Sequence, residues 1–171
     1  MVGSAELAWI PENTYAISMN VVKQILKSIQ APPANVVKII AVRQDGKILI
    51  LRRSRVISIT RQNDLPGGIV DKGEDRVEAI RRETEEETGL KLNKLELLGN
   101  TSFWSAPIGP VELFGYVCDV EGEVKLSWEH DKYWWVSPQE ATEKFQLRKP
   151  YKVLIEKYVE NLSKPASRTT R

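Results

Sequence analysis

The sequence predicts an α/β (α+β) fold in which helices pack on a mixed β-sheet. Strand and helix patterns alternate along the chain, yet several strands are joined by short turns, which a purely parallel sheet does not allow. The composition, with 42% hydrophobic and 28% charged residues among 171, is that of one globular domain with an apolar core. This apolar content excludes a chain that is disordered throughout.

Cysteine content and hydropathy exclude two further classes of protein. Cys118 has no partner for a disulfide, and no apolar run approaches the roughly 18 residues of a membrane-spanning helix. The N-terminus lacks a basic start followed by an apolar stretch, so it does not resemble a signal peptide. We therefore expect a cytoplasmic protein with no membrane partner.

The first predicted elements are an amphipathic helix and a β-hairpin. Residues 17–29 carry isoleucine and valine at helical spacing, and the prolines of the APPAN segment end this helix. The β-branched residues 36–42 predict a strand, which Asp45-Gly46 connects to a second strand at 47–53. The second strand is apolar on both faces, which is typical of a central strand.

The remaining chain predicts a glycine loop, three helices and three strands. The LPGG segment at 65–68 is a loop, and the helix at 74–88 that follows ends at Gly89. Strands are expected at 95–104, 111–120 and 132–136. Ser137-Pro138 opens a short helix, and residues 150–162 form the last one.

Three carboxylates share one stripe of the predicted helix at 74–88. Glu83, Glu86 and Glu87 stand at positions i, i+3 and i+4, where like charges destabilise a helix by a few tenths of a kcal/mol per pair. Arg82, one turn before Glu86, offsets part of this repulsion. Hard divalent cations bind carboxylate oxygens, and Mg²⁺ binds through a few carboxylates together with substrate phosphates. The stripe is therefore a candidate magnesium site.

The spacing of residues 68–90 resembles the Nudix box, GX5EX7REUXEEXGU, in which U is a bulky aliphatic residue. Gly68 is followed after five residues by Glu74, and seven residues later the REUXEEXGU part begins at Arg82. Only Thr84 departs from the pattern, at an aliphatic position. On a helical wheel Thr84 lies beside Val77 and Ile80, on a stripe predicted to face the core. The departure therefore concerns stability more than chemistry.

The resemblance to the Nudix hydrolase family implies a helix–sheet–helix sandwich that hydrolyses a nucleoside diphosphate linked to another group. By that resemblance the family's metal ligands would be Glu83, Glu86, Glu87 and the backbone carbonyl of Gly67. Arg82 would hold these carboxylates by ion pairing. Mg²⁺ is the expected cofactor, and Mn²⁺ is the alternative.

Further residues are placed at the site by the same resemblance. Glu74 would lie at the edge of the metal cluster, and Glu129 would be an acidic ligand from a loop before a late strand. The residue that takes the proton of the attacking water would be Glu83 or Glu86. His130, which neighbours Glu129 in the sequence, is an alternative base.

Substrate contacts are expected from basic and aromatic residues. Some relatives carry a cation directly after the glycine pair, where this chain has Ile69, so Arg52, Arg53 or Arg61 would contact phosphate instead. Base stacking requires aromatic faces, and the candidates are Trp104 and Tyr133, together with Phe103 and Trp134.

The expected substrate is a (deoxy)nucleoside triphosphate or an oxidised nucleotide. An ADP-ribose or nucleotide-sugar pyrophosphatase is an alternative, and so is a non-catalytic module that binds a nucleotide and regulates a partner. The Nudix domain would span 36–162, between an N-terminal extension at 1–35 and a basic, disordered tail at 163–171. The helix at 17–29 would cover the sheet or mediate a homodimer, and no stable nucleic-acid partner is expected.

Overall fold

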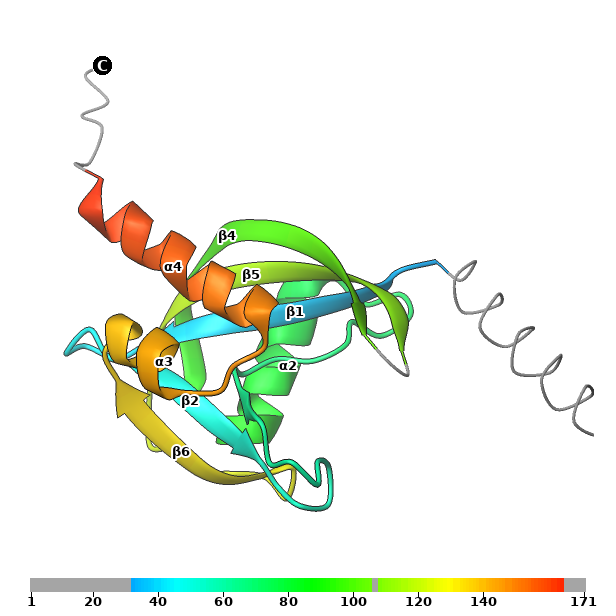
Figure 1. Ribbon diagram of the computed structural model, residues 1–171, viewed down its shortest axis with the longest axis horizontal. Helices are drawn as coiled ribbons and strands as arrows, with labels where there is room; N and C mark the ends of the chain where they lie inside the picture. Colours follow the sequence, from blue (N-terminus) through cyan, green and yellow to red (C-terminus); the bar gives the residue numbers. More distant parts are fainter. Residues whose placement is uncertain (1–31, 106–107, 165–171) are drawn as a thin grey trace, which may run out of the picture.

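The computed structural model describes residues 32–105 and 108–164 (Figure 1). Its elements, in chain order, are β1 (Ala34–Val42), β2 (Ile48–Arg53), β3 (Asn63–Asp64), α2 (Arg76–Thr88), β4 (Lys91–Ser105), β5 (Gly109–Glu121), β6 (His130–Val136), α3 (Pro138–Lys144) and α4 (Lys149–Ser163). This order agrees with the sequence prediction except for the two-residue strand β3, which was not predicted. The expected helix at 17–29 and most of the expected tail lie outside the described residues.

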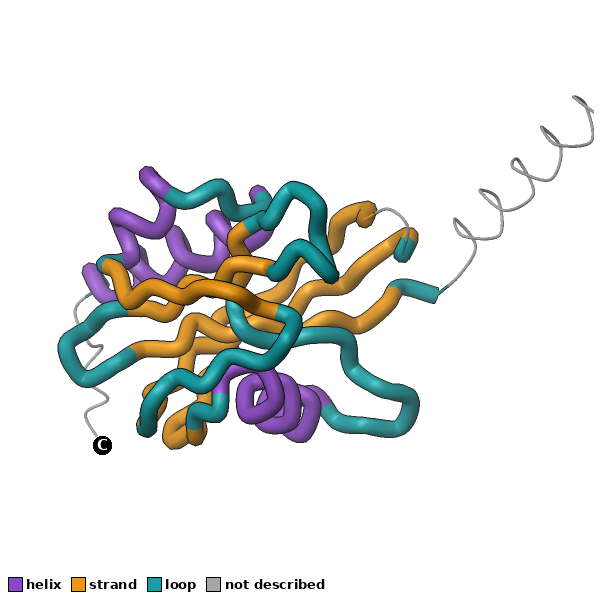
Figure 2. The backbone as a smooth tube through the Cα atoms, turned by 90° about the horizontal axis from the view of Figure 1, so that it is seen from below, coloured by secondary structure: helices purple, strands orange, loops and turns teal. Residues whose placement is uncertain are grey.

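The strands form one mixed sheet with helices on both faces (Figures 1 and 2). Its order is β3-β2-β1-β5-β4, and β6 pairs with β2. β1 and β5 are parallel, whereas β2 is antiparallel to β1, β3 and β6, and β4 is antiparallel to β5. The predicted mixed sheet is therefore confirmed. No helix of the described residues is long and apolar enough to cross a membrane.

Strand β2 is central, as its two apolar faces predict. Ile48 and Ile50 belong to the core cluster that includes Leu154 of α4. Leu49 and Leu51 point to the opposite face and join the cluster that includes Ile80 of α2. Because each such side chain contributes about 1.5–3 kcal/mol when fully buried, β2 fixes the two helix layers on either side of the sheet.

Helix α2 is capped at both ends, by the Asp75 side chain at its start and by the backbone of Gly89 at its end. The Asp75 carboxylate accepts hydrogen bonds from the backbone N–H groups of Val77 and Glu78, and the Glu78 side chain bonds back to the N–H of Asp75. The helix therefore begins at Arg76, slightly later than predicted. Gly89 ends it with a left-handed φ of 67°.

The predicted core stripe of α2 is partly wrong. Ile80 and Thr84 are fully buried, but Val77 is 41% exposed. In the first turn Arg76 is also exposed, and its guanidinium carbon lies 3.4 Å from the centre of the Phe114 ring. The buried stripe therefore begins at Ala79 and Ile80, one turn later than expected.

Lys38 is a buried cation in β1. The sequence predicted this strand from its β-branched residues and did not indicate that Lys38 is buried. Its Nζ lies 2.9 Å from Asp64 Oδ1 and donates to the backbone carbonyls of Leu65 and Gly67. Both charged side chains are about 95% buried. Burial lowers the pKa of Lys38, but Asp64 outweighs it, so the net pKa lies above the usual range. Lys38 thus holds the LPGG loop against β1.

We expect Thr84→Val to stabilise the protein by about 1 kcal/mol. The buried hydroxyl of Thr84 has no hydrogen-bond partner among the described residues, and valine removes it without changing the shape of the side chain. Thr84→Ser is the matched control, since it keeps the hydroxyl, loses a methyl group and should destabilise. Urea titration measures both variants. A destabilised valine variant would contradict the assignment of Thr84 to the core.

We expect Lys38→Met to destabilise the fold by about 3–5 kcal/mol, because it leaves the Asp64 carboxylate buried without its closest cation. Thermal and urea unfolding measure the effect. Asp64→Asn removes the charge of the partner, so the double variant should cost clearly less than the sum of the two single variants. Additive costs would show that the two side chains do not act as a pair.

Candidate active site

The glycine loop lies directly against the acidic face of α2. It runs beside the first half of β1, where the N–H groups of Val37 and Ile39 donate to the carbonyls of Gly68 and Pro66, each at 2.9 Å. Gly67 has a left-handed φ of 119°, and a Cβ there would overlap the carbonyl of Val37. A Cβ on Gly68 would collide with the Glu83 carboxylate. Glycine is therefore required for this close approach.

Arg82 gathers three of the carboxylates that the box contributes. Its Nε lies 2.9 Å from Glu74 Oε1, and its Nη1 lies 2.8 Å from Glu83 Oε1 and 3.4 Å from Glu86 Oε2. Its Nη2 also donates to the carbonyl of Ile69. Hydrogen bonding from Arg82 holds the pKa of Glu74 below its usual range. The guanidinium therefore offsets the repulsion between the carboxylates, as the sequence predicts.

Glu87 is held separately from the Arg82 group. Its side chain is buried, and Oε2 accepts a 2.9 Å hydrogen bond from the N–H of Gly67. Burial raises the pKa of Glu87 to about 8, although Lys38 acts in the opposite direction. A cation beside a buried carboxyl group stabilises its ionised form and lowers its pKa again.

The segment before β6 folds over the C-terminal end of α2. The N–H groups of Lys125 and Ser127 donate to the carbonyls of Thr88 and Glu87, at 2.8 and 3.2 Å. Two residues further on, Glu129 is half-buried, and its carbonyl accepts a 2.7 Å hydrogen bond from Ser54. These backbone bonds bring the loop that carries Glu129 to the same end of the helix as Glu87.

His130 lies inside the protein beneath this loop. Its Nε2 is 4.0 Å from Glu87 Oε1, and neither ring nitrogen has a hydrogen-bond partner among the described residues. Burial lowers the pKa of His130 to about 4, so the ring is neutral at pH 7. A buried neutral ring next to Glu87 favours a structural role over that of the alternative base.

The chemistry of this donor set fits a hard divalent cation. Glu83, Glu86, Glu87 and the carbonyl of Gly67 offer only oxygen atoms, which Mg²⁺ and Mn²⁺ prefer. Within the described ranges, no three His, Cys, Asp or Glu side chains already stand together as a metal-binding group. Arg82 holds Glu83 and Glu86, the Gly67 amide holds Glu87, and Lys38 contacts the Gly67 carbonyl.

A cavity of about 120 Å³ opens where the glycine loop meets β4, β5 and α4. Gly67 and Gly68 border it, so the same turn contacts both the cavity and the carboxylates of α2. Its walls are about evenly polar and apolar, and three basic residues reach it. Its lining includes Val36, Phe103, Val111, Tyr151, Arg53 and Arg148.

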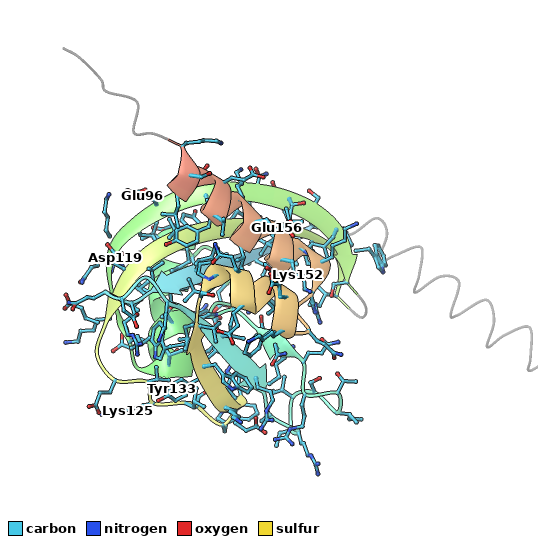
Figure 3. All side chains as sticks on the ribbon, turned by 60° about the vertical axis from the view of Figure 1, so that its left-hand side comes forward. Glu96, Asp119, Lys125, Tyr133, Lys152 and Glu156 are labelled. Atoms are coloured by element: carbon cyan, nitrogen blue, oxygen red, sulfur yellow. The ribbon has the colours of Figure 1, made fainter. Side chains whose placement is uncertain are left out.

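The basic and aromatic candidates divide between this cavity and other surfaces. Arg53 lines the cavity and lies 3.3 Å from Asp64 Oδ2. Arg52 and Arg61 instead form ion pairs with Asp131 on the surface. Two other candidates line no part of the cavity. Trp104 is 52% exposed on β4, and Tyr133 borders the 122–124 turn, with Lys125 drawn near it in Figure 3.

Strand alternation separates two neighbouring aromatic candidates, Phe103 and Trp104. Phe103 and Ser105 both line the cavity, and Trp104 between them belongs to the other face of β4. Arg148 and Tyr151, at the start of α4, also line the cavity and were not among the sequence-based candidates. Arg148 precedes Pro150 and Tyr151 follows it. This segment showed only the pattern of a helix in the sequence, so no local signal identified the two residues as part of a binding site.

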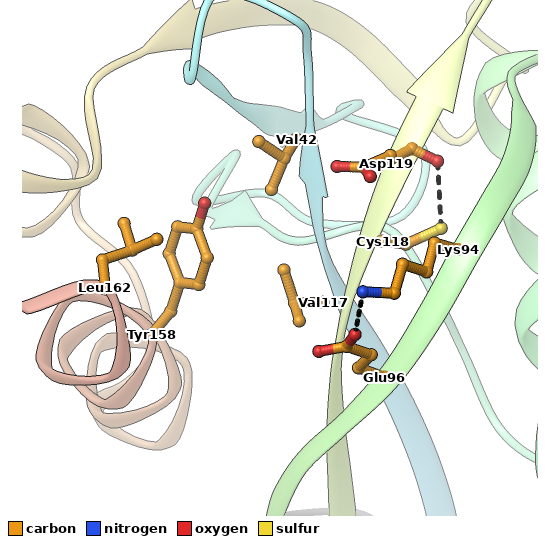
Figure 4. A pocket seen from close by; sticks show the side chains of 8 residues that line it. All are labelled: Val42, Lys94, Glu96, Val117, Cys118, Asp119, Tyr158 and Leu162. Atoms are coloured by element: carbon orange, nitrogen blue, oxygen red, sulfur yellow. Dashed lines mark hydrogen bonds and ion pairs between the residues drawn. The ribbon is translucent and has the colours of Figure 1, made fainter. Parts of the chain in front are cut away.

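A second cavity, of about 210 Å³, lies between the sheet and the end of α4 (Figure 4). It contains the ion pair of Lys94 with Glu96 and the thiol of Cys118, which donates to the Asp119 carbonyl at 3.2 Å. None of the box residues lines this cavity. The candidate active site is therefore the glycine loop, the acidic face of α2 and the cavity at β4, β5 and α4.

Comparison with known proteins identifies the family of this chain. Residues 32–158 match the family model described as NUDIX domain. The bis(5'-nucleosyl)-tetraphosphatase [asymmetrical] of Sus scrofa is 32% identical over 97 residues, which are 53% of this chain and 66% of that enzyme. A MutT-like protein of Streptomyces ambofaciens is 31% identical over 117 residues, 67% of this chain and 71% of that protein.

Solved structures agree with the sequence matches. The crystal structure of the MutT protein from Methanosarcina mazei Go1 superposes with a TM-score of 0.66 and 28% identity, and covers 79% of this chain and 99% of that one. The family model spans most of the chain, and the chain carries the box on the helix that faces the glycine loop. The chain therefore belongs to the Nudix hydrolase family of nucleotide pyrophosphohydrolases.

Proposed function

We propose that this protein is a Mg²⁺- or Mn²⁺-dependent pyrophosphohydrolase of nucleoside polyphosphates, and that Glu83, Glu86 and Glu87 hold the metal. The proposal rests on one observation. The glycine turn touches the carboxylate of Glu83 through Gly68 and that of Glu87 through the Gly67 amide. Acidic oxygens from two turns of a helix thereby meet a backbone that is free of side chains, where a phosphate chain has room to approach.

The residues divide the work of hydrolysis between them. A bound metal ion would neutralise phosphate charge and lower the pKa of a water. Glu83 or Glu86 would accept a proton from the attacking water as the new P–O bond forms, while the bridging P–O bond breaks and the bridging oxygen leaves with the departing phosphate. Arg82 keeps Glu74, Glu83 and Glu86 in place through its guanidinium. Glu74 and Glu129 belong to the edge of the same site.

We propose that the cavity beside the glycine loop receives the nucleoside. Phe103 and Tyr151 offer aromatic surfaces there, and Val36 and Val111 complete an apolar wall. Since Gly67 and Gly68 border the cavity, a nucleoside in it would extend its phosphates across the turn toward Glu83. A nucleoside triphosphate, intact or oxidised, is the substrate class that this arrangement favours.

A bis(5'-nucleosyl) polyphosphate is a second candidate substrate. The Sus scrofa relative is named for this class. In this chain Trp128 is 66% exposed next to Glu129, so a second nucleobase could stack on it at the far end of the phosphate chain. The non-catalytic alternative is disfavoured because every carboxylate of the box is retained.

We expect Glu86→Gln to lower kcat by about 10²–10⁴-fold, because it removes a carboxylate from the proposed metal and base group. Glu85→Gln is the matched control: Glu85 is the exposed neighbour on the same helix and stands at a variable position of the box, so its activity should stay unchanged. Release of phosphate and pyrophosphate from a nucleotide panel, with Mg²⁺ and with a chelator, measures the effect. Equal turnover by both variants would contradict the role of Glu86.

A further inference from the structure

Arg148 is a cation of the cavity that no carboxylate neutralises. Among the described residues, Lys38 and Arg53 both contact Asp64, whereas Arg148 makes no ion pair within 4.0 Å. Its Nη1 donates a single 3.2 Å hydrogen bond to Ser105 Oγ. A guanidinium has five N–H donors, so most of them remain available.

The acceptor groups of the cavity are already engaged. Asp64 Oδ1 accepts from Lys38 and from the N–H of Leu65, and Oδ2 faces Arg53. The hydroxyl of Ser105 accepts from Arg148. The cavity therefore offers mainly donors to a ligand. They come from Arg53, whose charge Asp64 balances, and from Arg148, whose charge no carboxylate of the described residues balances.

The walls around Arg148 suit a flat aromatic ligand. Phe103 and Tyr151 contribute ring surface, and the remaining wall includes the buried Val36 and Val111. A nucleobase bound there would meet a fork of donors. Guanine presents two neighbouring acceptors, O6 and N7, that match such a fork, whereas adenine places its N6 amino donor beside N7.

We propose that Arg148 selects guanine nucleotides by donating to the O6/N7 edge of the base. The inference rests on the proposed function, because it assigns the base specificity of the same site. Adenine would set its amino group against the guanidinium and leave one of the two donors without an acceptor, since only N7 remains to accept. A good bidentate contact of this kind discriminates between bases on the order of ten- to a hundredfold.

The test compares kcat/KM for dGTP, dATP, dCTP and dTTP in the full chain with Mg²⁺. We expect the wild type to favour dGTP over dATP by about ten- to a hundredfold, and Arg148→Gln to lose most of this preference. Arg148→Lys keeps the charge but not the fork, so it should retain only part of the preference. Lys149→Gln, which changes the exposed neighbouring charge, should leave the preference unchanged.

Binding of GMP and AMP, measured by calorimetry without metal, separates this inference from the proposed activity. Tighter binding of GMP that depends on Arg148 supports the inference even where no nucleotide is hydrolysed, an outcome that would overturn only the proposed function. Hydrolysis without a guanine preference would overturn the inference alone. An equal loss for all four bases in both Arg148 variants would also overturn it, since that pattern indicates a phosphate contact. If Arg148→Gln fails to fold, the inference is tested by the preference of the wild type for dGTP over dATP and by the reduced preference expected of Arg148→Lys. Absence of a guanine preference in the wild type would then overturn it.

Discussion

The site depends on the absence of a side chain at two consecutive positions. Gly67 can pass beside the carbonyl of Val37 and offer its amide to Glu87, and Gly68 can touch the Glu83 carboxylate. A Cβ at Gly67 would overlap the backbone of Val37 in β1, and a Cβ at Gly68 would displace the Glu83 carboxylate. The loop in turn stays in place because Lys38 binds its carbonyls from below. The buried ion pair of Lys38 and Asp64 thus supports the turn that lies against the acidic face of α2.

Electrostatics at the site balance two opposite demands. Acidic side chains are needed to bind a cation, yet four of them close together repel one another when no cation is present. Arg82 compensates the outer three, while Glu87 is kept apart by burial and a backbone hydrogen bond. A cation bound as we propose would compete with Arg82 for Glu83 and Glu86, so Arg82 would limit metal affinity while it orders the ligands.

The sequence predicts features with a local cause and misses those that depend on tertiary packing. Strand β2 and helix α2 follow from apolar patterning, the Asp75 cap and Gly89, all of which are local. The box spacing identifies the acidic helix for the same reason. Lys38 escaped notice because an isolated lysine in an apolar strand reads as a surface residue, and its partner Asp64 is distant in sequence. Arg148 and Tyr151 reach the cavity only through the packing of α4 on the β4–β5 hairpin.

The affinity of Gly68→Ala for Mn²⁺ tests the central claim most directly. The added methyl group would occupy the place of the Glu83 carboxylate, and the backbone of Gly68 does not have a left-handed φ, so the change is steric. Electron paramagnetic resonance measures the binding of Mn²⁺, and thermal unfolding measures the stability of the variant. The two measurements together distinguish a loss of metal binding from a loss of the fold. We expect Mn²⁺ to bind about 10–100-fold more weakly while the protein still unfolds cooperatively. Unchanged Mn²⁺ affinity and unchanged nucleotide turnover in this variant would contradict the account.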